Sequence, residues 1–287
     1  MASILTTAEE LHDALIARRY DDGGPVRLLD VRWRLDRPDG RPDHRSGHIP
    51  GAQYVALDED LADHHAPASE GRHPLPSVEK LQAAARRWGI SRGDTVVVYD
   101  DAKNTASARA WWLLRFAGFA DVRLLDGALR AWTDAGYDFE KGDAETPAPG
   151  TVDLSYGALP SLALDEVAAF AEDGLLLDAR AAERYRGETE PIDPRAGHIP
   201  GAVSAPTIDN VGEDGRFRSP DELRTRFRML GAEDGVSVGV YCGSGVTAAH
   251  QAVALSLAGF EPRVFPGSWS QWSNHPELPV ATGPDPR

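Results

Sequence analysis

The sequence has little of three things, and each shortage excludes a class of protein. One cysteine, Cys242, occurs in 287 residues, which excludes an internal disulfide and a multi-cysteine zinc or iron–sulfur site. Lys and Arg number 30 against 45 Asp and Glu, and this net charge of −15 argues against a broad nucleic-acid surface. No stretch approaches the run of about 20 apolar residues that spans a bilayer.

The first 15 residues also lack the basic-then-apolar pattern of a secretory signal, and they carry Glu9, Glu10 and Asp13 instead. Hydrophobic residues make up 41% of the chain, enough for a packed core. We therefore expect a soluble, cytoplasmic protein that has neither a membrane nor a nucleic-acid partner.

The two halves of the chain carry the same landmarks in the same order. The hexapeptide GHIPGA occupies residues 47–52 and recurs without change at 197–202. Further matched segments are 28–32 with 176–180, 96–100 with 237–242, 117–119 with 258–260, and 127–132 with 267–272. Asp100 stands where the second half has Cys242. Identity over six residues at matching positions predicts a duplicated domain.

Between the halves, residues 141–150 are rich in Pro, Gly and charge and have no apolar periodicity, as linkers do. We predict a first domain at residues 1–140, a linker at 141–160 and a second domain at 161–287.

Short apolar runs rich in β-branched residues alternate with helical patterns in each half. The expected strands cover residues 26–31, 95–99, 122–125, 174–178, 236–241 and 263–265. The expected helices cover residues 6–19, 77–88, 105–117, 163–172, 220–230 and 247–258. This alternation predicts an α/β protein of two domains, each a mostly parallel sheet flanked by helices.

Cys242 follows an expected strand and precedes Gly243, Ser244, Gly245 and a helix. Ligands of parallel α/β sheets bind at this carboxyl edge, and glycines let successive N–H groups point inward to form an anion site. A cysteine there would be a reactive thiolate. The alternative is a buried, inert cysteine, but the strand, glycine-rich loop and helix favour the reactive one.

The loop from Cys242 through Val246 and Thr247 resembles the active-site loop of 3-mercaptopyruvate sulfurtransferases of the rhodanese superfamily. The paired GHIPGA motifs and Gly267-Ser268-Trp269 resemble the same family, over nearly the whole chain. The resemblance implies two rhodanese-like domains, an inactive first one and a catalytic second one. It also implies a persulfide on Cys242, bound by the backbone of Gly243, Gly245, Val246 and Thr247, without metal or organic cofactor.

The same loop separates the family's members. The active-site loop of thiosulfate-preferring rhodaneses resembles Cys-Arg-Lys-Gly-Val-Thr, in which two cations bind a dianionic donor. This chain has Gly243 and Ser244 at the positions of these two cations. The difference favours 3-mercaptopyruvate as the donor, with thiosulfate as the alternative. Phosphatases of this fold need an Arg that closes the loop, and Ala248 and Ala249 stand there instead.

Four further residues match the family by position. Arg184 and Arg195 match two arginines that hold the donor's carboxylate and carbonyl, although the segment between them is about two residues longer here. Asp58 and His73 match the acid and the histidine of a relay that Ser244 completes. Because both precede residue 140, we expect the active site at a domain interface. A locally bonded loop histidine is the alternative for His73.

Polar residues that occur in both halves of the chain are expected to have structural roles. The first half lacks the cysteine, so a residue that it shares with the second half is not explained by catalysis. This applies to His48 and His198 and to two strand-end pairs, Asp30 with Arg32 and Asp178 with Arg180. The expected partners are a small-molecule sulfur donor and a thiol or thioredoxin-like acceptor. A non-catalytic module that relays persulfide sulfur is the alternative of another class.

Overall fold

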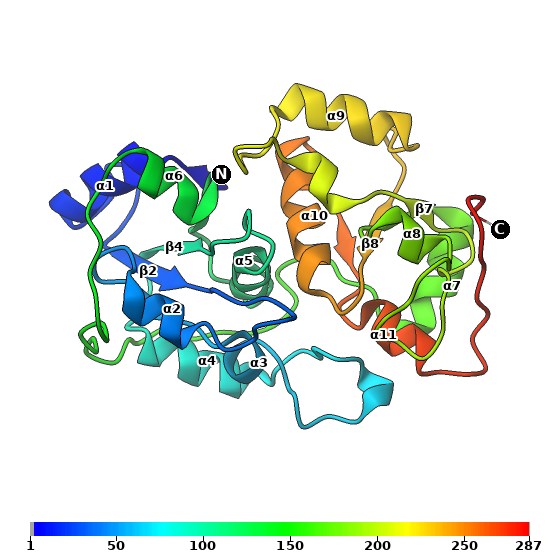
Figure 1. The fold of residues 1–287 in the computed structure, drawn as a ribbon, viewed down its shortest axis with the longest axis horizontal. Coiled ribbons are helices and arrows are strands. Elements are labelled where there is room, and N and C mark those ends of the chain that lie inside the picture. Colours follow the sequence, from blue (N-terminus) through cyan, green and yellow to red (C-terminus); the bar gives the residue numbers. More distant parts are fainter. Residues whose placement is uncertain (1–2, 287) are drawn as a thin grey trace. The chain divides into compact units, whose positions relative to one another are not determined.

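The structure, a computed structural model that describes residues 3–286, contains two compact units. The first unit holds the residues up to 62, then 76–159 and 212–217. The second unit holds residues 63–75, 160–211 and those from 218 onward. Each unit is an α/β domain with one parallel sheet, as the sequence predicts (Figure 1).

The sheet of the first unit has five strands in the order β1-β5-β4-β2-β3, all parallel. Its strands are β1 (Leu5–Thr6), β2 (Val26–Asp30), β3 (Gln53–Tyr54), β4 (Thr95–Tyr99) and β5 (Val122–Leu125). The central strand β4 reads TVVVY and is buried throughout. A continuous apolar, β-branched run of this kind is typical of a strand that is covered on both faces.

Helices cover this sheet on both sides. The helices of the unit are α1 (Ala8–Ala17), α2 (Arg41–Ser46), α3 (Leu57–Asp60), α4 (Val78–Arg87), α5 (Ser107–Phe116) and α6 (Ala128–Asp134). Helices α1 and α6 share a core cluster with Val97 and Tyr99 of β4. Because side chains alternate along a strand, Val96 and Val98 face the opposite side. Helix α5 packs against β4 and β5.

The second unit repeats this plan with four parallel strands in the order β7-β6-β8-β9. Its strands are β6 (Leu175–Asp178), β7 (Val203–Ser204), β8 (Val238–Tyr241) and β9 (Arg263–Val264). Its helices are α7 (Leu164–Asp173), α8 (Ala182–Tyr185), α9 (Pro220–Met229), α10 (Val246–Leu257) and α11 (Ser268–Ser273). The helices α7 and α11 join the core around β6 and β8, and α10 packs against β8 and β9.

The duplication extends to strand register and buried polar contacts. Asp30 pairs with Tyr99 between β2 and β4, and Asp178 pairs with Tyr241 between β6 and β8. Each tyrosine hydroxyl accepts a hydrogen bond from the isoleucine N–H of its own GHIPGA motif, at 3.2 Å in both units. The repeat read from the sequence is therefore a structural duplication.

The polar residues that occur in both halves have the structural roles expected of them. Arg32 pairs with Asp30 and donates to the carbonyl of Gly47 at 2.7 Å, and Arg180 does the same with Asp178 and the carbonyl of Gly197. In the GHIPGA motifs, the Nδ1 atoms of the two histidines, His48 and His198, lie within 3 Å of backbone carbonyl oxygens. These contacts fix the loop at each strand end.

Residues 63–75 belong to the second unit, although they precede the expected boundary at residue 140. Polar contacts explain this grouping, since Arg72 N donates to Ser270 Oγ at 3.1 Å and His275 Nε2 lies 3.1 Å from Ser69 O. The segment includes the helical turn η1 (Ala68–Glu70). His73 therefore lies in the same unit as Cys242, not across a domain interface as expected.

Residues of the expected linker form hydrogen bonds with the first unit. Gly150 N donates to Arg86 O at 2.7 Å, and Tyr156 Oη donates to Pro76 O at 2.7 Å, so residues up to 159 group with the first unit. Residues 212–217 also belong to the first unit, where Phe217 N donates to Asp126 Oδ1 at 3.0 Å.

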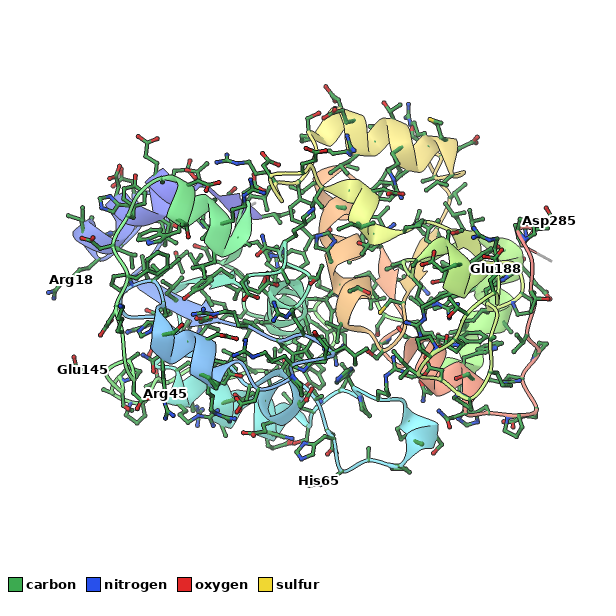
Figure 2. The ribbon with its side chains drawn as sticks, in the orientation of Figure 1. Arg18, Arg45, His65, Glu145, Glu188 and Asp285 are labelled. Atoms are coloured by element: carbon green, nitrogen blue, oxygen red, sulfur yellow. The ribbon has the colours of Figure 1, made fainter. Side chains whose placement is uncertain are left out.

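Side chains fill the interior of each unit, whereas charged residues such as Arg18, Arg45 and Asp285 lie at the outside (Figure 2). Among residues 3–286, no helix has the length and apolar character needed to cross a membrane.

Candidate active site around Cys242

Cys242 follows β8 directly and begins a tight loop that leads into α10. Gly245 ends the loop as the N-cap of α10, with a φ of 79°, a left-handed conformation that glycine adopts without strain. Its N–H group donates to Cys242 Sγ at 3.1 Å. Cys242 is 1% exposed, so its sulfur accepts this hydrogen bond in the buried interior of the unit.

The start of α11 holds the other side of the loop. Ser268 Oγ accepts a hydrogen bond from Cys242 N at 3.0 Å and lies 3.9 Å from Cys242 Sγ. Trp269 N donates to Cys242 O at 2.9 Å, and Ser270 N donates to Gly243 O at 2.8 Å. Ser268 has a φ of 54°, an unusual value for a residue with a Cβ atom. Three consecutive residues thus fix the backbone of Cys242 and Gly243.

The predicted pair of Ser244 and His73 is in contact. His73 Nδ1 lies 2.8 Å from Ser244 Oγ, and each residue is 7% exposed. Asp58, the expected acidic member, lies in α3 of the first unit, and its role remains a prediction. Val246 and Thr247 are the first two residues of α10, where N–H groups have no acceptor inside the helix.

Arg184 lies at the end of α8 and forms a network with two buried carboxylates. Its Nη2 atom is 2.6 Å from Glu190 Oε1 and 3.2 Å from Asp193 Oδ2. Burial disfavours the ionised form of Glu190, but hydrogen bonds from Arg184 and the backbone outweigh it and lower the pKa of Glu190. Burial raises the pKa of Asp193, although the charge of Arg72 opposes that shift.

Arg195 does not join this network. Its guanidinium donates to four backbone carbonyls at 2.7 to 3.0 Å, those of Trp272, Ser273, His275 and Leu278. A guanidinium has five N–H donors, so one is left for any other partner. These contacts fix the segment after α11, and donor binding by Arg195 remains a prediction.

Arg72 lies beside the cysteine loop, although the sequence reasoning did not single it out. Its Nη1 atom pairs with Asp193 Oδ1, and a Cβ placed on Gly243 would lie 3.1 Å from its Nη2 atom. The one available signal was its place next to His73. Position alone could not reveal it, because the proximity of residues 72 and 243 arises from long-range packing.

In the first unit, Asp100 takes the place of the cysteine and fills the corresponding loop. Its carboxylate accepts hydrogen bonds from four backbone N–H groups, those of Ala102, Asn104, Ala106 and Ser107, at 2.8 to 2.9 Å. Burial nevertheless raises the pKa of Asp100, although these four hydrogen bonds act to lower it. This loop is an anion-binding loop that is occupied by its own side chain.

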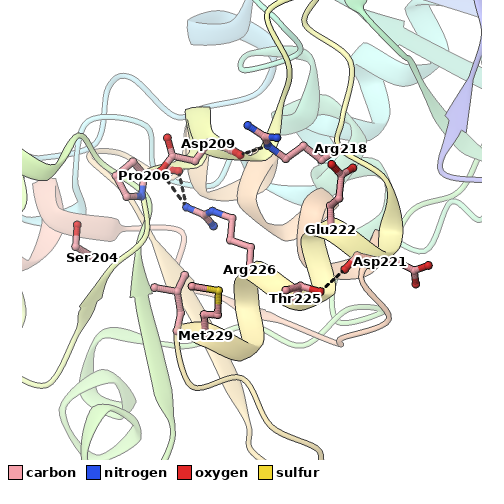
Figure 3. A pocket seen from close by; sticks show the side chains of 10 residues that line it. Ser204, Pro206, Asp209, Arg218, Asp221, Glu222, Thr225, Arg226 and Met229 are labelled. Carbon is pink, nitrogen blue, oxygen red and sulfur yellow. Dashed lines mark hydrogen bonds and ion pairs between the residues drawn. The ribbon is translucent and has the colours of Figure 1, made fainter.

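A hollow on the second unit lies beside α9 and the turn η2 (Thr207–Asn210), as Figure 3 shows. Arg218 and Arg226 both bind Asp209 there, through its carbonyl and its carboxylate respectively. None of the predicted site residues lines this hollow. In the part of the chain that the structure describes, no group of three or more His, Cys, Asp or Glu residues could hold a metal ion.

The chain matches the rhodanese-like domain family twice, at residues 7–135 and 163–275. "Putative thiosulfate sulfurtransferase SseB" of Mycobacterium tuberculosis is 47% identical over 98% of this chain and 97% of that protein. A "Probable 3-mercaptopyruvate sulfurtransferase" of Pseudomonas aeruginosa is 46% identical over 89% of this chain and 92% of its own length.

Solved structures agree with the fold. The crystal structure of SseA from Escherichia coli, described as a 3-mercaptopyruvate sulfotransferase, superposes with a TM-score of 0.80 at 30% identity, covering 93% of this chain and 99% of SseA. Two family matches cover most of the chain, and the relatives align over nearly their full lengths. The chain therefore belongs to the rhodanese superfamily and is a sulfurtransferase with two rhodanese-like domains.

Proposed function

We propose that this enzyme moves the sulfur of 3-mercaptopyruvate onto Cys242 and then to a thiol or cyanide acceptor, releasing pyruvate. The observation that carries the proposal is the N–H of Gly245, which donates to Cys242 Sγ at 3.1 Å at the start of α10. A donor in this position stabilises a thiolate and, after transfer, the anionic persulfide.

In the first step, the Cys242 thiolate attacks the donor's sulfur. A sulfur–sulfur bond forms as the bond between that sulfur and C3 of the donor breaks, and the electron pair of the broken bond enters the enolate of pyruvate. The proton of the donor's thiol leaves sulfur and ends on C3, which balances the charges on both sides. The protein gains one sulfur atom and the donor becomes pyruvate.

Ser244 and His73 are the groups proposed to move that proton. The 2.8 Å contact between Ser244 Oγ and His73 Nδ1 lets the histidine orient or deprotonate the hydroxyl, which can then accept the donor's thiol proton. Asp58 stays the acidic member of this relay that the family resemblance predicts. Arg184 supplies a cation for the donor's carboxylate.

The charges near the loop favour a monoanionic donor. Three guanidinium groups, those of Arg72, Arg180 and Arg184, are linked to three carboxylates, those of Asp178, Glu190 and Asp193. The sum of these charges is zero, so a dianion gains little net attraction, whereas a planar carboxylate can still use the fork of an arginine.

Thiosulfate is the second candidate donor, because the relative from Mycobacterium tuberculosis carries that name and two guanidinium groups lie beside Gly243. The ratio of kcat/KM for the two donors decides between them. A larger value with thiosulfate would reverse the assignment.

The acceptor in the cell is proposed to be a thiol or a thioredoxin-like dithiol, which takes the outer sulfur of the persulfide. A relay module without catalysis would receive persulfide from another protein and would not cleave a donor. A single-turnover assay of pyruvate release separates the two, since a relay module releases none.

Mass spectrometry of the protein after incubation with 3-mercaptopyruvate tests the proposal directly. We expect a gain of one sulfur atom on the peptide that contains Cys242, together with release of pyruvate. An unmodified Cys242 after incubation with an excess of donor contradicts it.

A further inference from the structure

The first residues of α11 and α6 are matched positions of the duplication, and they differ by one hydroxyl group. Ser268 begins α11 beside Cys242, whereas Ala128 begins α6 beside Asp100. We propose that the Ser268 hydroxyl takes part in the transfer by turning its proton toward Cys242 Sγ when this sulfur becomes an anion. The inference rests on the proposed function, because it assumes that Cys242 is negatively charged as a thiolate and as a persulfide.

The backbone at these two positions is the same, so it does not require the hydroxyl. Ser268 has a φ of 54° and Ala128 has a φ of 56°, both in the left-handed region. The residue after each of them donates its N–H to the carbonyl of Cys242 or of Asp100, at 2.9 Å in both units. This conformation is unfavourable for a residue with a Cβ atom, and the chain adopts it with alanine as well as with serine. The backbone therefore does not explain the serine.

The Ser268 hydroxyl has one proton and two acceptors within reach. Its oxygen lies 3.0 Å from Phe265 O and 3.9 Å from Cys242 Sγ. The same oxygen accepts a hydrogen bond from Cys242 N at 3.0 Å, which holds it beside the sulfur. Ser268 is completely buried, so bulk water does not compete for the proton.

The charge of the sulfur decides which acceptor receives the proton. A neutral thiol is a weak acceptor, so the hydroxyl donates to the carbonyl of Phe265 instead. A thiolate or a persulfide is an anion, and hydrogen bonds to ionised groups are roughly twice as strong as those between neutral groups. Rotation of the O–H bond moves the proton while the oxygen stays in place, so the anion is stabilised with little reorganisation.

The two loops differ in the donors that they offer. Asp100 accepts from four backbone N–H groups, and Ala128 has no hydroxyl to add. Cys242 Sγ accepts from Gly245 N at 3.1 Å, and Ser268 adds a side-chain donor from another helix. The serine thus occurs in the half that has the cysteine and the alanine in the half that lacks it, which fits a role of the hydroxyl at the sulfur.

Three variants test this inference. Ser268→Ala removes the hydroxyl, and Ala128 shows that alanine can adopt the required φ. Ser268→Gly also removes the hydroxyl, and glycine adopts a positive φ without strain. Ser273→Ala is the matched control, because Ser273 is a buried serine of the same helix whose Oγ makes no hydrogen bond within residues 3–286.

The first measurement is the pH profile of alkylation by iodoacetamide, followed by mass spectrometry. The chain has one cysteine, so a gain of one carbamidomethyl group reports on Cys242. In both Ser268 variants we expect the midpoint of the profile to move to higher pH by about one unit, because the thiolate loses a charged hydrogen bond. Ser273→Ala should keep the wild-type profile.

Three outcomes of this measurement overturn the proposal. The first is an unchanged midpoint in Ser268→Ala. The second is a shift in Ser268→Ala that Ser268→Gly does not share, since it would arise from the backbone. The third is an equal shift in Ser273→Ala. The charged groups around the loop are the same in all four proteins, namely Arg72, Arg180, Arg184, Asp178, Glu190 and Asp193. If Ser268→Ala melts far below the wild type, the unstrained Ser268→Gly provides the test.

The second measurement is the single-turnover rate at which 3-mercaptopyruvate loads sulfur onto Cys242. At a pH below all midpoints, we expect this rate to fall about tenfold in both Ser268 variants, in proportion to the thiolate that is lost. Loading at the wild-type rate overturns the role of Ser268 in transfer. Alkylation needs no donor, so a shifted midpoint supports the hydroxyl even if the wild type forms no persulfide and the proposed function fails.

Discussion

At the scale of the residue, Cys242 is fixed through its backbone as much as through its sulfur. Its N–H and C=O groups bind Ser268 and Trp269, and its Sγ atom accepts from Gly245. In the proposed transfer, a sulfur held in this way would need little reorganisation to accept a second sulfur atom.

Cys242→Ser should abolish sulfur transfer, because a hydroxyl is not ionised at neutral pH and forms no persulfide. The two backbone contacts of Cys242 do not need sulfur, so we expect the thermal midpoint to change little. Mass spectrometry after incubation with the donor and a thermal melt check both expectations. Pyruvate release by the variant at the wild-type rate contradicts the role of the cysteine.

Ser244→Ala should lower kcat/KM for 3-mercaptopyruvate by about 100-fold, the lower range for loss of a proton-transferring group. Transfer from preformed persulfide to cyanide should be affected less, because cyanide brings no proton. Separate measurement of the two half-reactions checks this. Equal losses in both would point to a structural role for the contact with His73.

At the scale of the element, the two halves build the same loop around two different side chains. In the first unit the Asp100 carboxylate accepts from four backbone N–H groups, and in the second unit the sulfur of Cys242 accepts from Gly245. The amides of the first loop therefore depend on Asp100 for their hydrogen bonds.

Asp100→Ala should lower the free energy of unfolding by about 2–4 kcal/mol, because buried N–H groups lose their acceptor. The neighbouring, exposed Asp101 provides the control, and Asp101→Ala should change stability by about 0.5 kcal/mol or less. Urea unfolding of the two variants measures both values. If Asp100→Ala leaves the free energy of unfolding unchanged, removal of the buried charge compensates for the lost hydrogen bonds.

The sequence predicted those helices and strands that are long enough to show a hydrophobic periodicity. The central strands β2, β4, β6 and β8 and the long helices were all expected. The strands β1, β3 and β7 have two residues each, too few for any alternation to be visible. Helix α2 reads RPDHRS and has no apolar face, so its helical form depends on packing.

At the scale of the whole molecule, buried carboxylates respond to pH in two opposite ways. Hydrogen bonds from His44 and Arg32 outweigh burial and lower the pKa of Asp30 below 3.8. Its stabilising contribution is present above that value and is lost as the pH falls through the folded-state pKa. Burial raises the pKa of Asp100 and Asp193, so their contributions fall as the pH rises through the folded-state values.

Asp30→Asn should lower the unfolding free energy at neutral pH by about 3–5 kcal/mol, because Arg32 stays buried without its counter-charge. The stability of the variant should also fall less than that of the wild type as the pH drops below about 4. Denaturant unfolding between about pH 7 and about pH 3 tests both points. The same acid dependence in both proteins would assign it to other carboxylates.

The sequence pointed to the cysteine, its loop, Ser244 with His73, and Arg184, because each lies in a local motif. The structure brings Ser244 and His73 into contact, and the roles of all these residues remain predictions. The sequence could not locate Arg72, nor the segments 63–75 and 212–217 that group with the other half of the chain. Hydrogen bonds between residues distant in the chain decide these placements, as for Arg72 N with Ser270 Oγ. Arg195 matches an arginine of the family by its position in the sequence. Its guanidinium group donates to four backbone carbonyls.

Asp100 also bears on how much sulfur one polypeptide is expected to hold. Its carboxylate already accepts from four backbone N–H groups of its loop, and this loop offers no cysteine that could carry a persulfide. Stoichiometric loading should therefore reach a plateau at one equivalent per chain, however large the excess of donor.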